Sequence, residues 1–194
     1  MTPPGYRRRM LFLDLGGGAR LAALEPWQAE EFFDHVDGIR EYLRPFITLP
    51  TRVSTVEDAR RFLQRYAVSQ AEDSGRLYGI WVSGVLSGGT VFRSFDATGG
   101  TCEIGVWLSP PVQGRGIMTT AVRHMIDWAI TVRGLGRVEW LAVVGNSAST
   151  AVAKRVGMRF EGTKRSDYLL NGERYDSEVW SVISTEWPPA AGPT

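Results

Sequence analysis

The sequence has little of what would tie it to several common classes of protein. It contains one cysteine, Cys102, which cannot form a disulfide within the chain, so nothing indicates an oxidising compartment. The net charge is only +1 and the basic residues form no stripe, so we expect no nucleic-acid partner. No apolar run approaches the ~18 residues of a membrane helix, and the first apolar stretch breaks at Asp14. We therefore expect no membrane insertion and a cytoplasmic location.

Motifs for metal binding and serine hydrolysis are also missing. The two histidines, His35 and His124, fall on predicted helices without partners at ligand spacing, so we expect no metal. Ser149 lies outside any Gly-x-Ser-x-Gly turn, which argues against a hydrolase nucleophile. With 194 residues and 43% hydrophobic content, the chain predicts one domain over residues 1–187. A flexible tail is expected at 188–194, in the proline-rich run that begins at Trp187.

The pattern of apolar residues predicts strands and helices in a mixed order. We expect a strand hairpin at 10–24, helices at 26–36 and from Ser54 or Thr55 to about 71, three strands at 77–82, 85–95 and 101–108, a helix at 116–133, a strand at 138–144, a helix at 148–156, and a final hairpin around Asn171-Gly172. The segment between the first two helices reads as a loop, and the strand at 138–144 as covered on both faces. This order predicts an α/β (α+β) fold with helices on both faces of a mixed sheet.

The most informative stretch of the chain is the glycine-containing turn before the helix at 116–133. It reads Gln113-Gly114-Arg115-Gly116-Ile117-Met118-Thr119. The glycines allow close approach of a bulky group, and the first amides of a helix lack partners within it. These amides, the helix dipole and the charge of Arg115 together predict a site for a diphosphate.

Two common nucleotide motifs do not fit this turn. The phosphate loop of nucleoside triphosphatases needs Lys followed by Ser or Thr after its last glycine, where this chain has Ile117 and Met118. The dinucleotide fingerprint needs a third glycine at the position of Thr119.

The turn instead resembles the acyl-coenzyme A site of the GCN5-related N-acetyltransferases (GNAT), whose motif is Gln or Arg, two residues, Gly, one residue, then Gly or Ala. Residues 113–118 match it except at Met118. The flanking segments 103–108, 146–153 and 157–158 are similar to the family as well, most of all to its RimJ/RimL-like branch, which acetylates the N-termini of ribosomal proteins. This resemblance implies a mostly antiparallel sheet of about seven strands with about four helices, acetyl-CoA as co-substrate, and a possible homodimer.

The resemblance also implies which residues hold the cofactor. In this fold the strand at 101–108 diverges from its neighbour, which frees the backbone of Val106, Trp107 and Leu108 to bond the pantetheine amides. The expected cofactor-binding residues are Val106, Trp107, Leu108, Gln113, Gly114, Arg115, Gly116, Ile117, Met118, Thr119, Asn146 and Ser149.

Acetyl transfer to an amine needs a group that takes a proton and a donor for the departing thiolate. Strand alternation places Glu103 on the face of the acceptor cleft. There it could act as a general base, or it could be an ordinary ion-pair partner of an arginine. Many family members use a tyrosine as the donor to sulfur, but this chain has Ala153 there. In the ribosomal-protein branch the proposed donor is a serine that corresponds to Ser149, whose alternative is a helix cap.

The acceptor side is less well defined. We expect it to be lined by Tyr42, Phe46, Tyr168 and Tyr175, with Asp176 binding an ammonium group or remaining a solvated hairpin charge. Glu103 is the one candidate general base, which favours an acceptor that loses its proton easily. At neutral pH an α-amine has about a few hundred-fold more of its neutral form than a lysine side chain, so an α-amine is the favoured acceptor. A small amine such as an antibiotic, and a non-catalytic coenzyme A sensor, remain alternatives.

Overall fold

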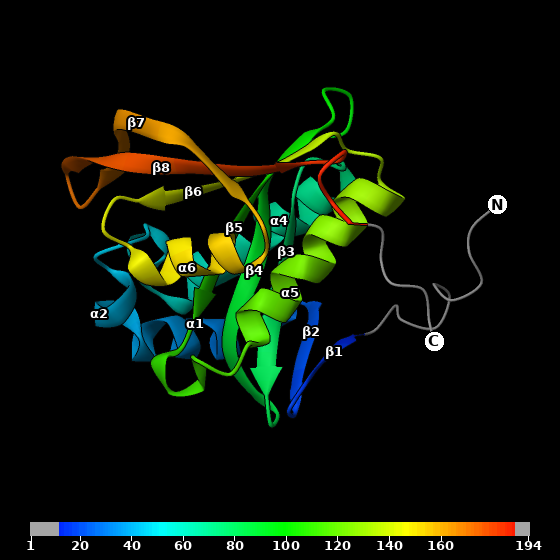
Figure 1. Cartoon of the computed structure of the whole chain (residues 1–194). Coiled ribbons are helices and arrows are strands. Elements are labelled where there is room, and N and C mark those ends of the chain that lie inside the picture. The colour runs from blue at the N-terminus through cyan, green and yellow to red at the C-terminus, as the bar shows by residue number, and fades with distance from the viewer. Residues whose placement is uncertain (1–11, 189–194) are drawn as a thin grey trace.

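A computed structural model of the chain describes residues 12–188 and shows one central sheet with helices on both faces (Figure 1). The strands are β1 (Leu13–Gly16), β2 (Ala19–Ala23), β3 (Arg76–Val82), β4 (Val85–Asp96), β5 (Thr101–Leu108), β6 (Arg137–Val143), β7 (Arg159–Leu170) and β8 (Glu173–Ile183). The helices are α1 (Ala29–Gly38), α2 (Arg40–Leu43), α3 (Leu49–Arg52), α4 (Val56–Ala71), α5 (Ile117–Asp127) and α6 (Ser147–Arg155). Short 3₁₀ helices lie at Pro26–Gln28 and Pro110–Val112, and a π-helical segment, Trp128–Val132, continues α5.

The strands are ordered β1-β2-β3-β4-β5-β6-β8-β7, and every neighbouring pair is antiparallel except β5 with β6. The connection between these two parallel strands carries α5, as a crossover between parallel strands requires. The predicted fold class is confirmed.

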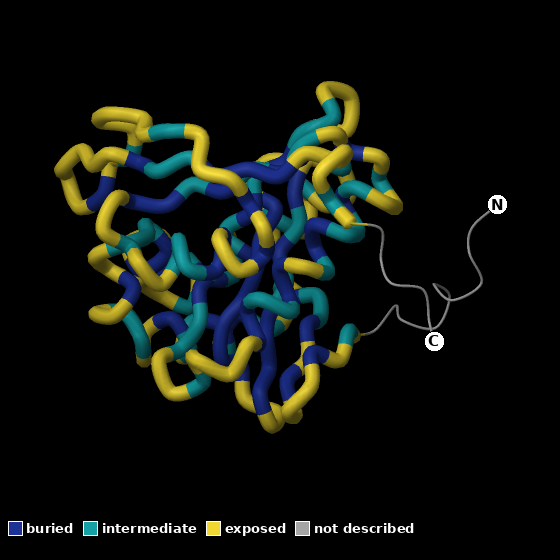
Figure 2. The backbone as a smooth tube through the Cα atoms, in the orientation of Figure 1, coloured by how far each residue is buried: buried dark blue, intermediate teal, exposed yellow. Residues whose placement is uncertain are grey.

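Each face of the sheet has its own hydrophobic core. On one face, α5 and α6 pack on residues such as Ile104 and Val138, and on the other, α1 and α4 pack on residues such as Leu77 and Trp107 (Figure 1). Figure 2 shows that burial is greatest along the central strands, whereas most of β7 is exposed. The central strands β3, β4 and β5 are therefore covered by helices on both faces. None of the helices within residues 12–188 combines the length and apolar character needed to cross a bilayer.

Local sequence signals explain most of the element boundaries. Thr55 caps α4 by accepting a hydrogen bond from the Asp58 amide at 3.1 Å, and Asn146 caps α6 in the same way. The β7–β8 turn has Asn171 at φ 52° and Gly172 at φ 86°, the left-handed pair that a tight hairpin requires. The predicted start of α4 at Thr55 and the predicted hairpins are confirmed, although residues 10 and 11 of the first hairpin lie outside the described part of the chain.

Several expectations are wrong in detail. Residues 12–188 form eight strands and six α-helices, instead of about seven and about four. The added helices include α2 and α3, which replace the predicted loop because Leu43 and Leu49 bury their side chains against α1 and α4. β6 is not covered on both faces, since Glu139 and Leu141 are only half-buried.

Trp187 is the last residue of the predicted domain. Its ring packs against the core that includes α5, and its Nε1 lies 3.4 Å from Asp127 Oδ1. Trp187 is thus part of the fold. Residues 189–194 of the expected tail lie outside the described residues, and the extent of the domain stays a prediction.

Candidate active site

The candidate site lies where β5 and β6 separate. Their parallel pairing runs from Thr101 opposite Arg137 to Ile104 opposite Trp140 and ends there, while β5 continues to Leu108 along β4. The predicted divergence is confirmed. One detail is wrong: the Leu108 carbonyl has a partner, because Gln113 Nε2 donates to it at 2.9 Å.

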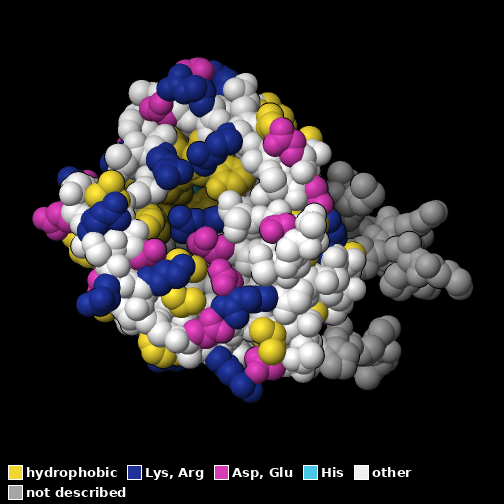
Figure 3. Space-filling model, turned by 90° about the horizontal axis from the view of Figure 1, so that it is seen from above, with side chains coloured by type: hydrophobic (Ala, Val, Ile, Leu, Met, Phe, Trp, Pro, Cys, Tyr) yellow, Lys and Arg dark blue, Asp and Glu magenta, His cyan; other side chains and the backbone are white. Residues whose placement is uncertain are grey.

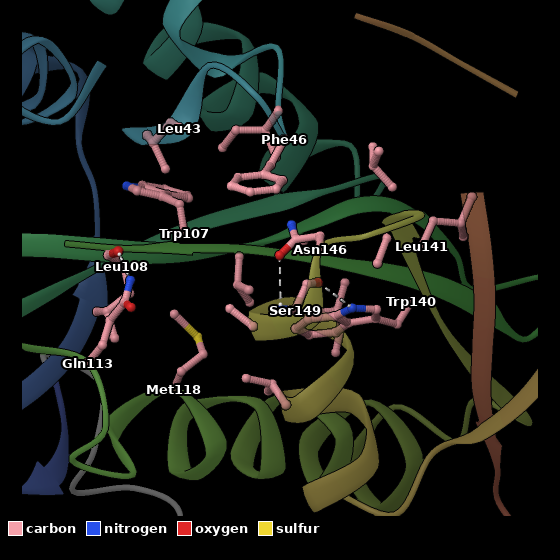
Figure 4. Close-up of a pocket in the computed structure, with 18 of the residues that line it drawn as sticks. Leu43, Phe46, Trp107, Leu108, Gln113, Met118, Trp140, Leu141, Asn146 and Ser149 are labelled. Atoms are coloured by element: carbon pink, nitrogen blue, oxygen red, sulfur yellow. Dashed lines mark hydrogen bonds between the residues drawn. The ribbon is translucent and has the colours of Figure 1, made fainter. Parts of the chain in front are cut away.

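A cavity of about 540 Å³ lies between the separated ends of β5 and β6. Figure 4 shows Trp107 and Phe46 on one side of it, Met118 of α5 on another, and Trp140 with Ser149 at the end opposite Gln113. Seen from above, the molecular surface has a hollow with hydrophobic side chains inside and Lys and Arg side chains at its rim (Figure 3). The cavity is therefore mainly apolar, with charge placed at a few points.

The phosphate end of the cavity is built from the start of α5. Gly114 and Gly116 have φ values of 74° and 77°, a conformation that costs little only for glycine, and a Cβ at either position would meet nothing within 4 Å. No side chain of residues 12–188 caps this helix, so its first amides are available to an anion. Arg115 and Arg155 both line the cavity here, and Arg115 Nη2 is held at 3.0 Å by the Gly17 carbonyl of the β1–β2 turn. This donor set fits the diphosphate of coenzyme A.

The cavity brings together most of the residues that the sequence singled out. Its lining includes Glu103 and Ser149, the acceptor-side residues Tyr42, Phe46 and Tyr168, and all of the expected cofactor-binding residues: Val106, Trp107, Leu108, Gln113, Gly114, Arg115, Gly116, Ile117, Met118, Thr119 and Asn146.

Two predicted acceptor-side residues lie elsewhere. Tyr175 donates its hydroxyl to Glu173 Oε2 at 3.0 Å, and Asp176 Oδ1 accepts from the Ser166 amide at 2.8 Å. The first bond lies within β8 and the second joins β8 to β7, and neither residue lines the cavity. Tyr175 pairs with Tyr168 across the hairpin, but it is 36% exposed and its hydroxyl is bonded to Glu173, so only Tyr168 lines the cavity.

Glu103 of β5 and Asp167 of β7 are two carboxylates that line the cavity. Of these, Glu103 lies on the strand that borders the opening. Burial raises its pKa above the ordinary value, while the Arg93 guanidinium opposes this shift. Arg93 Nη1 lies 3.2 Å from Glu103 Oε1, yet this buried oxygen has no hydrogen bond of good geometry within residues 12–188. Glu103 thus has an ion-pair partner and still keeps an acceptor free for a proton donor. A buried carboxylate of raised pKa is suited to general base catalysis.

Ser149 lies in the first turn of α6, across the cavity from β5. Asn146 Oδ1 accepts the Ser149 amide at 3.1 Å, so Asn146 is the helix cap and the Ser149 hydroxyl is not needed for capping. Trp140 Nε1 donates to Ser149 Oγ at 3.0 Å (Figure 4). The hydroxyl therefore lines the cavity with its own hydrogen available.

Three kinds of lining residue escaped the sequence. Arg93 is the extra residue of a bulge, because Phe92 pairs with Ile104 and Ser94 with Glu103. Arg155 lies seven residues after Ala148 on α6, and Ala148, Val152 and Arg155 all line the cavity, a helical spacing that could have revealed Arg155. Leu43 and Ile47 reach the acceptor side from the α2–α3 segment, for which the sequence predicts a loop. Among residues 12–188, no three His, Cys, Asp or Glu side chains are grouped as a metal site needs.

Comparison with known proteins decides the family. Residues 20–159 match the acetyltransferase (GNAT) domain, which is more than half of the chain. The chain belongs to the GNAT acetyltransferases. It is similar to the putative ribosomal N-acetyltransferase YdaF of Bacillus subtilis, with 30% identity over 84% of this chain and 90% of the relative. The ribosomal-protein-serine acetyltransferase of Escherichia coli is 28% identical over 74% of this chain and 80% of its own length.

Solved structures of GNAT enzymes share this fold. A structure of RimL, the ribosomal L7/L12 α-N-protein acetyltransferase, in complex with coenzyme A has a TM-score of 0.82 at 23% identity and covers 89% of this chain and 97% of its own. A probable acetyltransferase has a TM-score of 0.85 at 27% identity and covers 92% and 100%. This chain is accordingly an acetyl-CoA-dependent N-acetyltransferase of the GNAT family.

Proposed function

We propose that this enzyme acetylates the N-terminal α-amine of a protein, with a ribosomal protein as the first candidate, by direct attack while donor and acceptor are both bound. The observation that carries the proposal is the continuous cavity, in which the free Oε1 of Glu103 faces the same space as the phosphate turn and Ser149. Because one cavity reaches both ends of the site, the amine can meet the acetyl group without a covalent enzyme intermediate.

The acceptor side of the cavity supports a peptide terminus with a small or apolar first residue. Leu43, Phe46 and Ile47 supply apolar wall there. Tyr168 lines the same side, and its hydroxyl accepts a hydrogen bond from the Thr48 amide at 3.0 Å. The carboxylate of Glu103 is the natural partner of one α-ammonium group in this setting. Relatives named as ribosomal N-acetyltransferases support the same class of acceptor.

In the proposed mechanism each of the two polar groups has one task. Glu103 takes the proton that the amine loses, directly or through water, as the new C–N bond forms. Ser149 donates a hydrogen bond to the sulfur as the C–S bond breaks and its electron pair passes to sulfur. The amides at 117–119 with Arg115 and Arg155 would hold the diphosphate, and Asn146 would lie beside the pantetheine arm.

The test is thiol release from acetyl-CoA with matched acceptors. We would compare peptides beginning with Ser, Ala or Met with the same peptides blocked at the α-amine but carrying an internal lysine, and then with polyamines and aminoglycosides. The proposal expects turnover with the free peptides alone, with mass spectrometry locating the acetyl group on the α-amine. Turnover with small amines but no peptide would contradict it and would assign a small-molecule acceptor.

A further inference from the structure

The buried indole of Trp140 makes a contact that the family motif does not contain. Trp140 is on β6, only 1% exposed, and its Nε1 lies 3.0 Å from the Oγ of Ser149. Both residues line the cavity, and Figure 4 shows the indole edge turned toward Ser149. The ring thus forms part of the cavity wall and directs its polar edge to one hydroxyl.

The chemistry of an indole fixes the direction of this hydrogen bond. An indole N–H can only donate, so Ser149 Oγ must accept, and its lone pair is used in the direction of Trp140. The Ser149 amide is already bonded to Asn146, and within residues 12–188 the hydroxyl donates to no protein group. The remaining hydroxyl hydrogen is then free to point toward the cavity.

The position of the indole is set by the sheet and not by the helix that carries Ser149. Trp140 pairs with Ile104 of β5 and with Trp180 of β8, and the pair with Ile104 is the last one before β5 and β6 diverge. Strands on both sides therefore hold the donor at the edge of the opening. A donor fixed in this way orients the hydroxyl before any substrate arrives.

We propose that Trp140 is a positioning residue for acetyl transfer: its Nε1 holds Ser149 Oγ as an acceptor, so that the Ser149 O–H is aimed at the departing sulfur. This inference rests on the role proposed for Ser149. A hydrogen bond received by a hydroxyl also makes that hydroxyl a better donor. The proton count is unchanged, because the amine proton passes to Glu103 and then to water, and the thiolate takes a proton from water after it leaves.

The test compares Trp140→Phe with Ser149→Ala and with the double variant. Trp140→Phe keeps an aromatic ring and removes the N–H. One hydrogen bond of this kind corresponds to a loss of about tenfold in kcat. We expect that loss with an unchanged KM for acetyl-CoA, and we expect Trp140→Phe to cost nothing further once Ser149 is alanine.

The matched control is Trp180→Phe on the neighbouring strand. Trp180 is also buried, at 7% exposed, and its Nε1 donates to Glu178 at 2.9 Å, but it does not line the cavity. This variant loses a similar ring volume and should keep the parental kcat. If Trp140→Phe does not fold, benzothienylalanine at position 140 keeps the shape of the ring, replaces the N–H with sulfur, and should show the same loss.

Three outcomes would overturn the inference. A folded Trp140→Phe with parental kcat would show that the indole N–H has no role. An equal loss in the Ser149→Ala background would show that Trp140 acts through something other than Ser149. If Ser149→Ala alone leaves kcat unchanged, the role proposed for Ser149 fails and the inference fails with it. If Ser149→Ala lowers kcat but Trp140→Phe does not, only the inference about Trp140 fails.

Discussion

The half-buried histidine of α1 makes the stability of this protein depend on pH. His35 Nε2 accepts a hydrogen bond from Trp107 Nε1 at 3.1 Å, so the imidazole must be neutral on that side. Burial lowers the pKa of His35 from 6.5 to about 4, although a hydrogen bond with the Leu86 backbone and the nearby Glu31 carboxylate oppose the shift. Protonation would remove the acceptor for Trp107, whose ring lines the cavity.

The size and sign of the effect follow from linkage. Between about pH 6.5 and pH 4, the unfolded chain binds a proton at His35 that the folded chain does not, so the free energy of unfolding falls as pH falls. Relative to neutral pH the loss is about 2 kcal/mol at pH 5 and about 3 kcal/mol at pH 4. Below pH 4 both states are protonated at this position, and the loss levels off.

Urea unfolding followed by circular dichroism measures this loss at a series of pH values from 7.5 to 4.5. The comparison variant is His35→Gln, which offers an amide oxygen to Trp107 and does not titrate. Carboxylates such as Asp73 and Glu161, whose pKa values are lowered by arginines, affect both proteins equally. We expect the variant to lose about 2 kcal/mol less than the parent between pH 7.5 and pH 5. Parallel curves for the two proteins would refute the reasoning.

The remaining predictions concern the cavity. Glu103→Gln should lower turnover by about 100-fold and move its pH profile upward, because solvent must then deprotonate the amine; steady-state rates from pH 6 to pH 10 measure this, and an unshifted profile would remove Glu103 as base. Arg155→Gln should raise the KM for acetyl-CoA by about tenfold with kcat unchanged, because it removes a charge at the phosphate end. The control Arg159→Gln breaks a surface pair with Glu186 and should leave this KM unchanged. Equal effects of the two variants would argue against a phosphate contact by Arg155. Gly116→Ala should cost about 1 kcal/mol in thermal unfolding, because its φ is 77°, and a neutral result would show that the turn adapts.

The parts of the site that lie within one segment could be predicted, because neighbouring residues in the sequence form them. The glycine turn at 113–119, the cap at Asn146 and the apolar side of α5 are short-range signals, and the structure places each of them as expected. The acceptor side was harder, since it is assembled from three separate segments. The short helices α2 and α3 are too short to show a periodic apolar pattern in the sequence. Their apolar residues are buried only through packing in the core formed with α1 and α4.

Contacts between strands are not visible in the sequence. Tyr175 and Asp176 follow the β7–β8 turn, yet they bond to Glu173 and to the Ser166 amide and do not line the cavity. Arg93 reaches Glu103 only because a bulge in β4 gives it an extra position. Such shifts depend on how whole strands pair, which a single sequence does not reveal.

The sequence by itself determined the fold class, the glycine turn and the residues proposed for acetyl transfer, because these depend on spacing within one segment. The tertiary structure alone decided that Trp140 faces Ser149, that His35 accepts a hydrogen bond from Trp107, and that Glu103 keeps a free oxygen beside Arg93. Each of these contacts joins residues from different elements. Their energies come from burial and from the direction of single hydrogen bonds, and both are set only when the strands and helices have packed.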